Sequence, residues 1–441
     1  ALSGNRTTLD LTNGAFAATS KFAFITSLDT STLILNTVSG SLASGSTTVN
    51  ARDAAKAFDI QNSSAALDFG STIANHFNSG TVISITNSGT GSVTFSNLSI
   101  PTGGIGLLAN AGGTINIGGT ASTITAGTAL DITNTSFGSG ATFASITSSS
   151  SSGKGVNLNT VSGPVTINGG SITNSSSVAF DVQAGSSNIQ YAGTISNAAP
   201  LAVEVTNRTG GTVTFSGNIT NTGAGINLAS NTGGTITFSG ASQSLTTGTS
   251  TAVTSIANLG ATINFTGGAL VITTTSGTGF SATGGGTINV TGANNTITST
   301  TGSPVNIANT TIGASNVTFK SVSCNGASNG IVLNTTGATG GFVVTGTGTT
   351  DGSGGTIQNI TNRGVSAFST TNLSLKNMAF TNASMVDGPG PCGAADNSGC
   401  NAAIHLNTVT TATLDNVDIS GTTAEEGINV RNTSNFSLLG S

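Results

Sequence analysis

A recurring line of carboxylate and amide side chains is the part of this sequence that could do chemistry. The line runs Asp131, Asn157, Asp181, Glu204 and Asn227, and continues later with Asn306, His405 and Asn429. If successive repeats of the chain stack, Asp181 and Glu204 leave neighbouring strands about 5 Å apart. Two carboxylates this close repel each other unless one is protonated or a cation lies between them. The pair therefore predicts either an acid/base couple or a Ca²⁺ site.

The elements that would position this line are short strands with one buried face. Each member of the line lies in a motif such as residues 225–228, Gly-Ile-Asn-Leu, where apolar and polar residues alternate. An alternation with period two indicates a strand that buries one side. The motif recurs at residues 57–60, 129–132, 155–158, 179–182, 202–205, 304–307, 330–333, 403–406 and 427–430.

A second motif, an apolar pair two residues apart, keeps the same order along the chain. Its best example is Val213 and Phe215, followed by a short apolar piece at Ile219 and then by the motif at 225–228. The pair recurs at 93/95, 115/117, 165/167, 189/191, 236/238, 263/265, 288/290 and 317/319, at intervals of roughly 22–29 residues. Strands this short cannot bury a face alone, so the units must stack on one another. The sequence predicts an all-β solenoid with about three short strands per coil.

The repeats differ along the chain. We expect one continuous solenoid over 1–441, with a less regular start at 1–60, the most regular coils at 80–335, and longer coils at 336–441 that include a loop at 385–401. The second members of the apolar pairs predict a ladder of core rings that includes Tyr191, Phe215, Phe238 and Phe265. Cys392 and Cys400 flank a short loop and could close it with a disulfide, whereas the sequence offers no legible partner for Cys324.

Composition excludes several classes of function. Charged residues make up 6% of the chain and the net charge is −5, with Lys and Arg dispersed, so we expect no binding of nucleic acid or of an anionic membrane. No apolar run is long enough to span a bilayer. A disulfide would fit an oxidising, extracellular setting. The chain does not begin with Met, and no amphipathic cap follows its last apolar residues, which suggests self-association or a longer parent chain.

Glycine-bounded coils with three short strands, Asn in the turns and stacked interior rings resemble the right-handed parallel β-helix of pectin-lyase-like proteins and of bacterial secreted surface proteins. The charge-poor texture, rich in Thr, Ser, Asn and Gly, is most similar to the adhesin and autotransporter-passenger group. This resemblance implies an extracellular or cell-surface location in a bacterium. It also implies a structural or adhesive role, with glycans or a host or neighbouring cell surface as candidate partners.

The resemblance carries an enzymatic alternative, a polysaccharide lyase or glycoside hydrolase. In such enzymes catalytic residues project from a stacked strand face, which implies Asp181 and Glu204 as the working carboxylates. Against this, Asn and Asp are interchangeable on an exposed line, Arg208 lies downstream to offset charge, and the face lacks the Lys or Arg that an acidic polysaccharide would need. The chain also has no Trp and one Tyr for sugar stacking. We therefore expect a solvated line, no catalysis, and no cofactor except the candidate Ca²⁺.

Arrays of outward threonines give a third reading, ice binding. They would stack at Ser92/Thr94, Thr114/Asn116, Thr212/Thr214, Thr235/Thr237, Thr262/Asn264 and Thr287/Asn289. Threonine is also favoured on any exposed strand, and the varying coil length should disturb a lattice match. The sequence favours a non-enzymatic extracellular shaft, adhesive surface or filament subunit over both alternatives.

Overall fold

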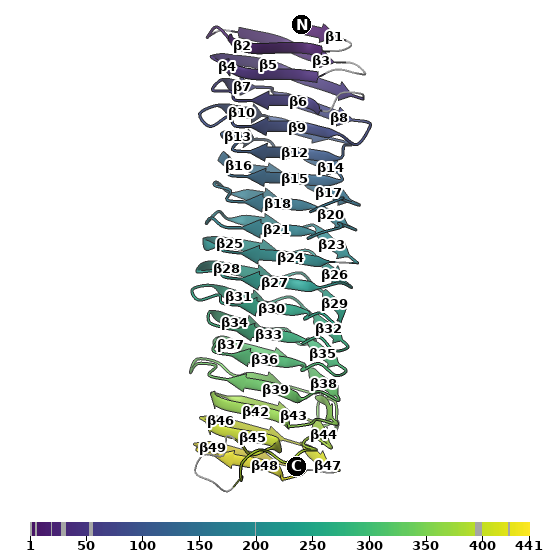
Figure 1. Cartoon of the computed structure of the whole chain (residues 1–441), viewed down its shortest axis with the longest axis vertical. Coiled ribbons are helices and arrows are strands. Elements are labelled where there is room, and N and C mark those ends of the chain that lie inside the picture. Colours follow the sequence, from purple (N-terminus) through teal and green to yellow (C-terminus); the bar gives the residue numbers. More distant parts are fainter. Residues whose placement is uncertain are drawn as a thin grey trace. The chain divides into compact units, whose positions relative to one another are not determined.

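The computed structural model describes residues 2–4, 7–18, 20–27, 32–52, 56–198, 200–392, 399–421 and 424–441. All regular elements in these ranges are β-strands. The same ranges hold no helix that could cross a membrane. The chain forms two compact units, Ala1–Gly217 (unit 1) and Asn218–Ser441 (unit 2), and each is a stack of short strands (Figure 1).

Each full coil passes through three faces, which we number in chain order. In unit 1 the first face holds β7 (Ala66–Asp68), β10 (Ser92–Phe95), β13 (Thr114–Ile117), β16 (Ser136–Phe143), β19 (Val165–Ile167), β22 (Ile189–Tyr191) and β25 (Thr209–Phe215). The second face holds β8 (Ser71–His76), β11 (Asn97–Ile100), β14 (Thr123–Ala126), β17 (Ser145–Ser149), β20 (Gly170–Thr173) and β23 (Thr194–Asn197). The third face holds β2 (Thr7–Ala15), β4 (Thr32–Ser39), β6 (Lys56–Gln61), β9 (Thr81–Thr86), β12 (Ile105–Asn110), β15 (Thr128–Thr133), β18 (Val156–Asn159), β21 (Phe180–Gln183) and β24 (Leu201–Thr206). At the start of the unit, β1 (Leu2–Gly4) pairs with β3 (Ser20–Ser27), which pairs with β5 (Ser41–Ala51).

Unit 2 repeats the same three faces. Its first face holds β28 (Gly233–Phe238), β31 (Thr262–Phe265), β34 (Thr287–Val290), β37 (Thr311–Phe319), β40 (Phe342–Val344), β43 (Leu373–Lys376), β46 (Thr411–Asp415) and β49 (Asn435–Leu439). Its second face holds β26 (Ile219–Asn221), β29 (Gln243–Gly248), β32 (Leu270–Thr274), β35 (Thr296–Ser299), β38 (Ser321–Asn325), β41 (Gly355–Gln358), β44 (Met378–Thr381) and β47 (Asp418–Ser420). Its third face holds β27 (Gly225–Ala229), β30 (Val253–Ile256), β33 (Phe280–Thr283), β36 (Val305–Ala308), β39 (Asn329–Asn334), β42 (Arg363–Thr370), β45 (Ala402–Val409) and β48 (Glu426–Arg431).

Strands of one face pair in parallel with the same face of the next coil. On the third face of unit 1, β21 pairs with β24 so that Phe180 aligns with Val203 and Asp181 with Glu204. On the first face of unit 2, β31 pairs in parallel with β34 without a shift. Counting third-face strands among the described residues gives nine coils in unit 1 and eight in unit 2. The predicted all-β solenoid with about three short strands per coil is confirmed.

The core lies inside the coils, where the inward side chains of all three faces meet. Phe238 and Phe265 stack with their ring centroids 4.7 Å apart and the ring planes 9° apart. In unit 1, Tyr191 and Phe215 both contact Phe180 of the third face, at 5.0 and 5.2 Å between centroids. The predicted ladder therefore lacked the third-face rings, which pack against first-face rings in edge-on or tilted arrangements. Phe58, Phe180 and Phe280 are these third-face rings.

A single residue in the left-handed backbone conformation follows most third-face strands. Asn134, Asn207 and Asn309 have φ of 48°, 56° and 50° there. Asparagine tolerates this conformation better than most residues because its short amide can hydrogen-bond to nearby backbone. One such residue bends the chain out of the third face, so each coil turns at the same place.

The residue after this bend points into the wall of the solenoid, and we call this position the corner. Its buried polar members are Ser63, Ser88, Thr135, Arg208, Asn231, Asn258, Thr310, Thr336 and Thr370. Asn231 donates from its backbone N and from Nδ2 to the same Oδ1 of Asn258, at 3.1 and 2.8 Å. Corner side chains thus hydrogen-bond one coil to the next inside a dry wall, where an unpaired polar group would be destabilising.

Coil length varies while the bend is kept. The left-handed residues Ser230 and Ala257 lie 27 residues apart, whereas Thr335 and Ser369 lie 34 apart, and Ser369 and Thr408 lie 39 apart. The additional residues lie at 345–354, between the first and second faces, and at 382–401, between the second and third faces. The middle of the second segment, 393–398, lies outside the described residues.

Candidate functional site

The line of polar residues predicted from the sequence runs along the outward side of the third face in unit 1. Parallel pairing aligns Asp131 of β15 with Asn157 of β18, Asn157 with Asp181 of β21, and Asp181 with Glu204 of β24. Asp181 and Glu204 therefore occupy neighbouring strands, as the repeat spacing predicted. We call these four residues, together with Lys154 and Gln183, the third-face cluster.

Lys154 enters the cluster from the turn that precedes β18. Its backbone carbonyl accepts hydrogen bonds from the Thr128 hydroxyl at 2.9 Å and from the Ser151 hydroxyl at 2.7 Å. From this fixed position the side chain reaches across the face. Its Nζ donates to Oδ1 of Asn157 at 3.2 Å and forms an ion pair with Oδ2 of Asp181.

Hydrogen bonds continue from both ends of this contact. Asn157 Nδ2 donates to Asp131 Oδ1 at 2.8 Å, and Gln183 Nε2 donates to Asp181 Oδ2 at 2.9 Å. The amide groups of Asn157 and Gln183 are oriented by these bonds, since each has an acceptor for its NH₂ group. Lys154 is thereby held between one amide oxygen and one carboxylate.

Asp181 is buried although it lies on the outward side of its strand. Its side chain is 0% exposed, whereas that of Lys154 is 31% exposed. Burial raises the pKa of the Asp181 carboxyl above its ordinary value, and the neighbouring Glu204 raises it as well, while Lys154 and Gln183 act in the opposite direction. Oδ1 of Asp181 has no hydrogen-bond partner. A buried carboxylate with one bare oxygen is electrostatically unfavourable, and Lys154 offsets only part of that penalty.

Two expectations about this face are therefore wrong. The line is not uniformly solvated, because Asp181 is buried. The face does not lack a basic residue either, because Lys154 lies on it, beside an open depression of about 360 Å³ that Asp131 and Asn157 also line. Sequence reasoning missed Lys154, although a signal existed: Lys56 likewise precedes a third-face motif and pairs with Asp59 at 2.8 Å.

Arg208, expected to offset the charge of the line, is buried at the corner. Its guanidinium donates to the backbone carbonyls of Ala184, Ser187 and Gly210, the last two at 2.5 and 3.3 Å. Arg208 therefore satisfies backbone carbonyl groups of the turn that follows the third face. Sequence position alone could not distinguish this from a surface charge.

Calcium binding at Asp181 and Glu204 stays a prediction. The Lys154 ammonium already lies against Asp181 and would repel a cation. In the described part of the chain, the one group of three potential metal ligands is Cys392, Cys400 and Glu425. Its two sulfur atoms are joined in a disulfide, so they are not available as thiolates.

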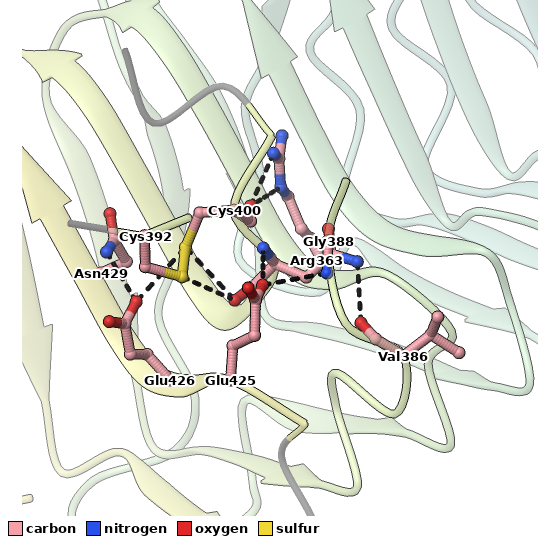
Figure 2. Close-up of a disulfide and its surroundings, with 9 residues drawn as sticks. Arg363, Val386, Gly388, Cys392, Cys400, Glu425, Glu426 and Asn429 are labelled. Atoms are coloured by element: carbon pink, nitrogen blue, oxygen red, sulfur yellow. Dashed lines mark hydrogen bonds between the residues drawn. A yellow bond between two sulfur atoms is a disulfide. The ribbon is translucent and has the colours of Figure 1, made fainter. Parts of the chain in front are cut away.

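A second polar cluster covers the outward side of the third face in unit 2. Cys392 and Cys400 form the disulfide that the sequence suggested (Figure 2). Arg363 of β42 donates from Nε and Nη2 to the Cys400 carbonyl at 2.9 and 2.7 Å. The Glu425 carboxylate accepts from the backbone N of Gly388 at 3.1 Å and of Asn401 at 2.5 Å. Two charged side chains thus fix residues next to the disulfide: Arg363 binds Cys400, and Glu425 binds Gly388 and Asn401.

His405 of β45 is fully buried. Its ring stacks on Phe368 at 5.0 Å between centroids, and neither ring nitrogen has a hydrogen-bond partner. Parallel pairing puts Ser366 and Asn429 on either side of it. The pKa of His405 is lowered to about 4, mainly by burial. The nearby Arg363 also lowers this pKa, and its effect is larger than the opposite effect of Glu425. The imidazole is therefore neutral at physiological pH and is part of the packing rather than an accessible base.

We expect acid to destabilise unit 2 through His405. Its pKa in the folded chain, about 4, lies below the ordinary value of 6.5. Below pH 6.5 the unfolded chain binds a proton at His405 that the folded chain does not. The free energy of unfolding is therefore highest above pH 6.5 and falls as the pH approaches the folded pKa of about 4. Between about pH 7.5 and about pH 5, His405 should remove about 2 kcal/mol from the free energy of unfolding.

The measurement is urea denaturation of wild type and of the His405→Asn variant at both pH values. The variant has no imidazole, so its stability should change less with pH by about that amount. An equal pH dependence in both proteins would contradict the assignment. Glu425→Gln serves as the matched control, because it alters the nearby charge and retains the imidazole.

We expect the disulfide to contribute about 2–3 kcal/mol by restricting the unfolded chain, given its short loop. The sequence separation of Cys392 and Cys400 is 8. Reduction of wild type should therefore lower the unfolding midpoint of unit 2 and increase hydrogen exchange around Arg363 and Asn401. The Cys392→Ser/Cys400→Ser variant should show the same lowered midpoint and no response to reductant.

Cys324 supplies the control for that measurement. It is a buried free thiol, and burial raises its pKa to about 12, so it is not a reactive thiolate. Cys324→Ala should respond to reductant as wild type does. A wild-type midpoint unchanged by reduction would contradict the expected stabilisation.

The hydroxyl arrays are only partly regular. On the first face, Thr235, Thr262 and Thr287 are aligned in consecutive coils, and on the second face Thr246, Thr273 and Thr298 are aligned. The first-face register shifts between Ile115 and Ile117 and between Ile288 and Val290. These bulges interrupt the spacing that a continuous lattice would need.

Comparison of the chain with protein-family models, with curated proteins and with solved structures found no match.

Proposed function

We propose that this chain is a non-enzymatic structural β-solenoid, an extracellular shaft, adhesive surface or filament subunit. The observation that carries the proposal is the uninterrupted parallel pairing of successive coils within each unit, on all three faces. Parallel ladders and a continuous core distribute load over many backbone hydrogen bonds. With 6% charged residues, few ion pairs contribute to stability, so salt should change that stability little.

The positions of the ionisable groups support a structural role. Asp181 and His405, which the sequence offered for chemistry, are both buried and covered by other side chains. Glutamates 425 and 426 bind backbone N–H groups and Asn429 rather than facing a cavity. A catalytic base must reach its substrate. Asp181 and His405 have no exposed surface for that contact, and Glu425 and Glu426 already accept hydrogen bonds from the protein itself.

We further propose that the solenoid stacks on more coils, from a second copy or from a longer parent chain. In β49, Phe436 and Leu438 are 37% and 49% exposed, although their paired residues Ala412 and Leu414 in β46 are buried. Added coils would cover this apolar strand by continuing the parallel pairing. Hydroxyl and amide arrays then offer repeated weak hydrogen bonds to glycans or to a cell surface.

Electron microscopy of native material tests the proposal. Fibres built by axial stacking, or long rods with this solenoid in their shaft, are the expected result. Isolated short particles that turn over a glycan would overturn it.

The enzymatic alternative, a polysaccharide lyase or glycoside hydrolase, is tested on a panel of acidic and neutral glycans with Asp181→Asn, and with Asp131→Asn as the control on the same line. Thermal hysteresis measurements test ice binding.

A further inference from the structure

The contact between Lys154 and Asp181 joins two consecutive coils of unit 1 by their side chains. The two residues are 27 positions apart in the chain, and the Lys154 Nζ lies directly against Oδ2 of Asp181. Hydroxyls of Thr128 and Ser151 fix the Lys154 backbone, and Gln183 holds the same Asp181 oxygen. The other oxygen, Oδ1, is buried without a partner. An amine held against the carboxyl of a dry, fixed carboxylic acid is the arrangement from which an amide can form.

We propose that Lys154 and Asp181 are the site of a covalent modification, an intramolecular isopeptide bond between Nζ of Lys154 and Cγ of Asp181. The inference does not depend on the proposed function, because it concerns the chemistry of two side chains whatever the solenoid does. It requires no cofactor or co-reactant.

The step begins with a proton transfer within the ion pair, from the Lys154 ammonium to the Asp181 carboxylate. That proton reaches Oδ2, the oxygen that Nζ contacts, so Oδ1 becomes the carbonyl oxygen. The neutral amine then attacks Cγ, and a C–N bond forms as the carbonyl π electrons move onto Oδ1. When the tetrahedral intermediate collapses, a second proton passes from nitrogen to the Oδ2 hydroxyl, the Cγ–Oδ2 bond breaks and Oδ2 leaves as water. The three ammonium hydrogens are accounted for, since two leave in the water and one remains on the amide nitrogen.

The neighbouring groups suit this sequence. Gln183 Nε2 donates to Oδ2, the oxygen that departs, and so fixes the orientation of the carboxyl group. Burial and Glu204 raise the pKa of Asp181, which favours the protonated carboxyl that amines attack. Glu204, one strand further on, supplies a second carboxylate that can carry the proton to the departing oxygen. Asn157 accepts a hydrogen bond from Nζ at 3.2 Å, which restricts the positions that the amine can take next to Asp181.

Other lysine–aspartate pairs of the described chain lack this setting and provide internal controls. Lys56 Nζ lies 2.8 Å from Asp59 Oδ1, and these side chains are 28% and 20% exposed. Lys376 Nζ lies 2.8 Å from Asp415 Oδ2, and these side chains are 37% and 33% exposed. Water reaches the aspartate in both pairs and keeps it charged, whereas Asp181 is 0% exposed. We expect these pairs to remain ion pairs.

The test is mass spectrometry of the full chain after complete reduction and denaturation. The expected mass is the sequence mass less one water molecule. Trypsin locates the bond, because it does not cleave after an acylated lysine. Lys154 is the one tryptic site between Lys56 and Arg208, so the expected product is a single 57–208 peptide that also lacks one water. Cleavage after Lys56 and Lys376 should proceed normally.

Two variants distinguish the bond from an ordinary ion pair. Lys154→Arg keeps the positive charge but should have the full mass and should release 57–154 and 155–208 as separate peptides. Asp181→Ala should also have the full mass. The Glu204→Gln variant should lose the one water molecule more slowly after refolding than wild type does. Its circular dichroism spectrum should be unchanged. A wild-type chain of full mass that trypsin cleaves after Lys154, or a water loss that maps to another pair, would overturn the proposal.

Discussion

Replacing Phe265 by alanine is expected to destabilise unit 2 by about 3–5 kcal/mol, the largest effect of any single substitution considered for this chain. Phe265 is 1% exposed, stacks on Phe238 and meets the edge of Phe280 at 5.9 Å between centroids. Its removal leaves a cavity at the point where rings from two faces meet. The wall around the cavity cannot close, because each neighbouring ring is fixed by a strand that pairs on both sides.

Urea denaturation measures the loss in free energy, and hydrogen exchange locates it. The coils that contain β28, β31 and β33 should exchange faster than those further along unit 2, since contacts in a solenoid are between neighbours. Phe436→Ala is the matched control, because Phe436 is 37% exposed. It should change stability by less than about 1 kcal/mol. Equal losses in the two variants would contradict the interpretation of the core.

Replacing Asn258 by alanine is expected to destabilise unit 2 by about 2–4 kcal/mol, since several buried hydrogen bonds are lost together. Asn258 is fully buried at the corner. It accepts from the backbone N and Nδ2 of Asn231, and its own Nδ2 donates to the Leu228 carbonyl at 2.9 Å and to the Ser255 hydroxyl at 3.0 Å. Alanine would leave the Asn231 backbone N–H and the Leu228 carbonyl without these partners in a dry wall.

Asn306→Ala is the control for this prediction. Asn306 is also an asparagine of unit 2, but it lies half-buried on the outward side of the third face. Its removal should change the free energy of unfolding by about 0.5 kcal/mol or less. If both variants unfold at the same urea concentration, the corner amides contribute no more than surface amides do.

The coil pattern could be predicted from the sequence because strand alternation is local. Two residues of a strand at spacing two lie on the same side of it. Val213 and Phe215 follow this rule, and both are buried. The alignment of Asp181 with Glu204 followed from their equivalent positions in successive copies of the same strand motif. Neither inference required knowledge of a neighbouring segment.

The errors concern side chains whose surroundings come from another part of the coil. Phe180 joins the ring ladder across the width of the coil, and the spacing of first-face residues does not reveal a partner there. Asp181 is buried next to Lys154, which reaches it from a turn one repeat earlier. His405 is buried against Phe368 of the preceding third-face strand. In each case the contacting side chain comes from another coil or another face, which the strand pattern does not reveal.

The constant bend after the third face also determines where this chain can gain length during evolution. Coils of 27, 34 and 39 residues all return to the same left-handed residue and corner position, so residues added at 345–354 or 382–401 leave the next coil in register. Insertions at those sites can therefore diversify the surface of the solenoid, as variable loops do on an antibody, while duplication of whole coils changes its number of repeats. A protein built this way can alter what it presents to its surroundings without altering how it folds.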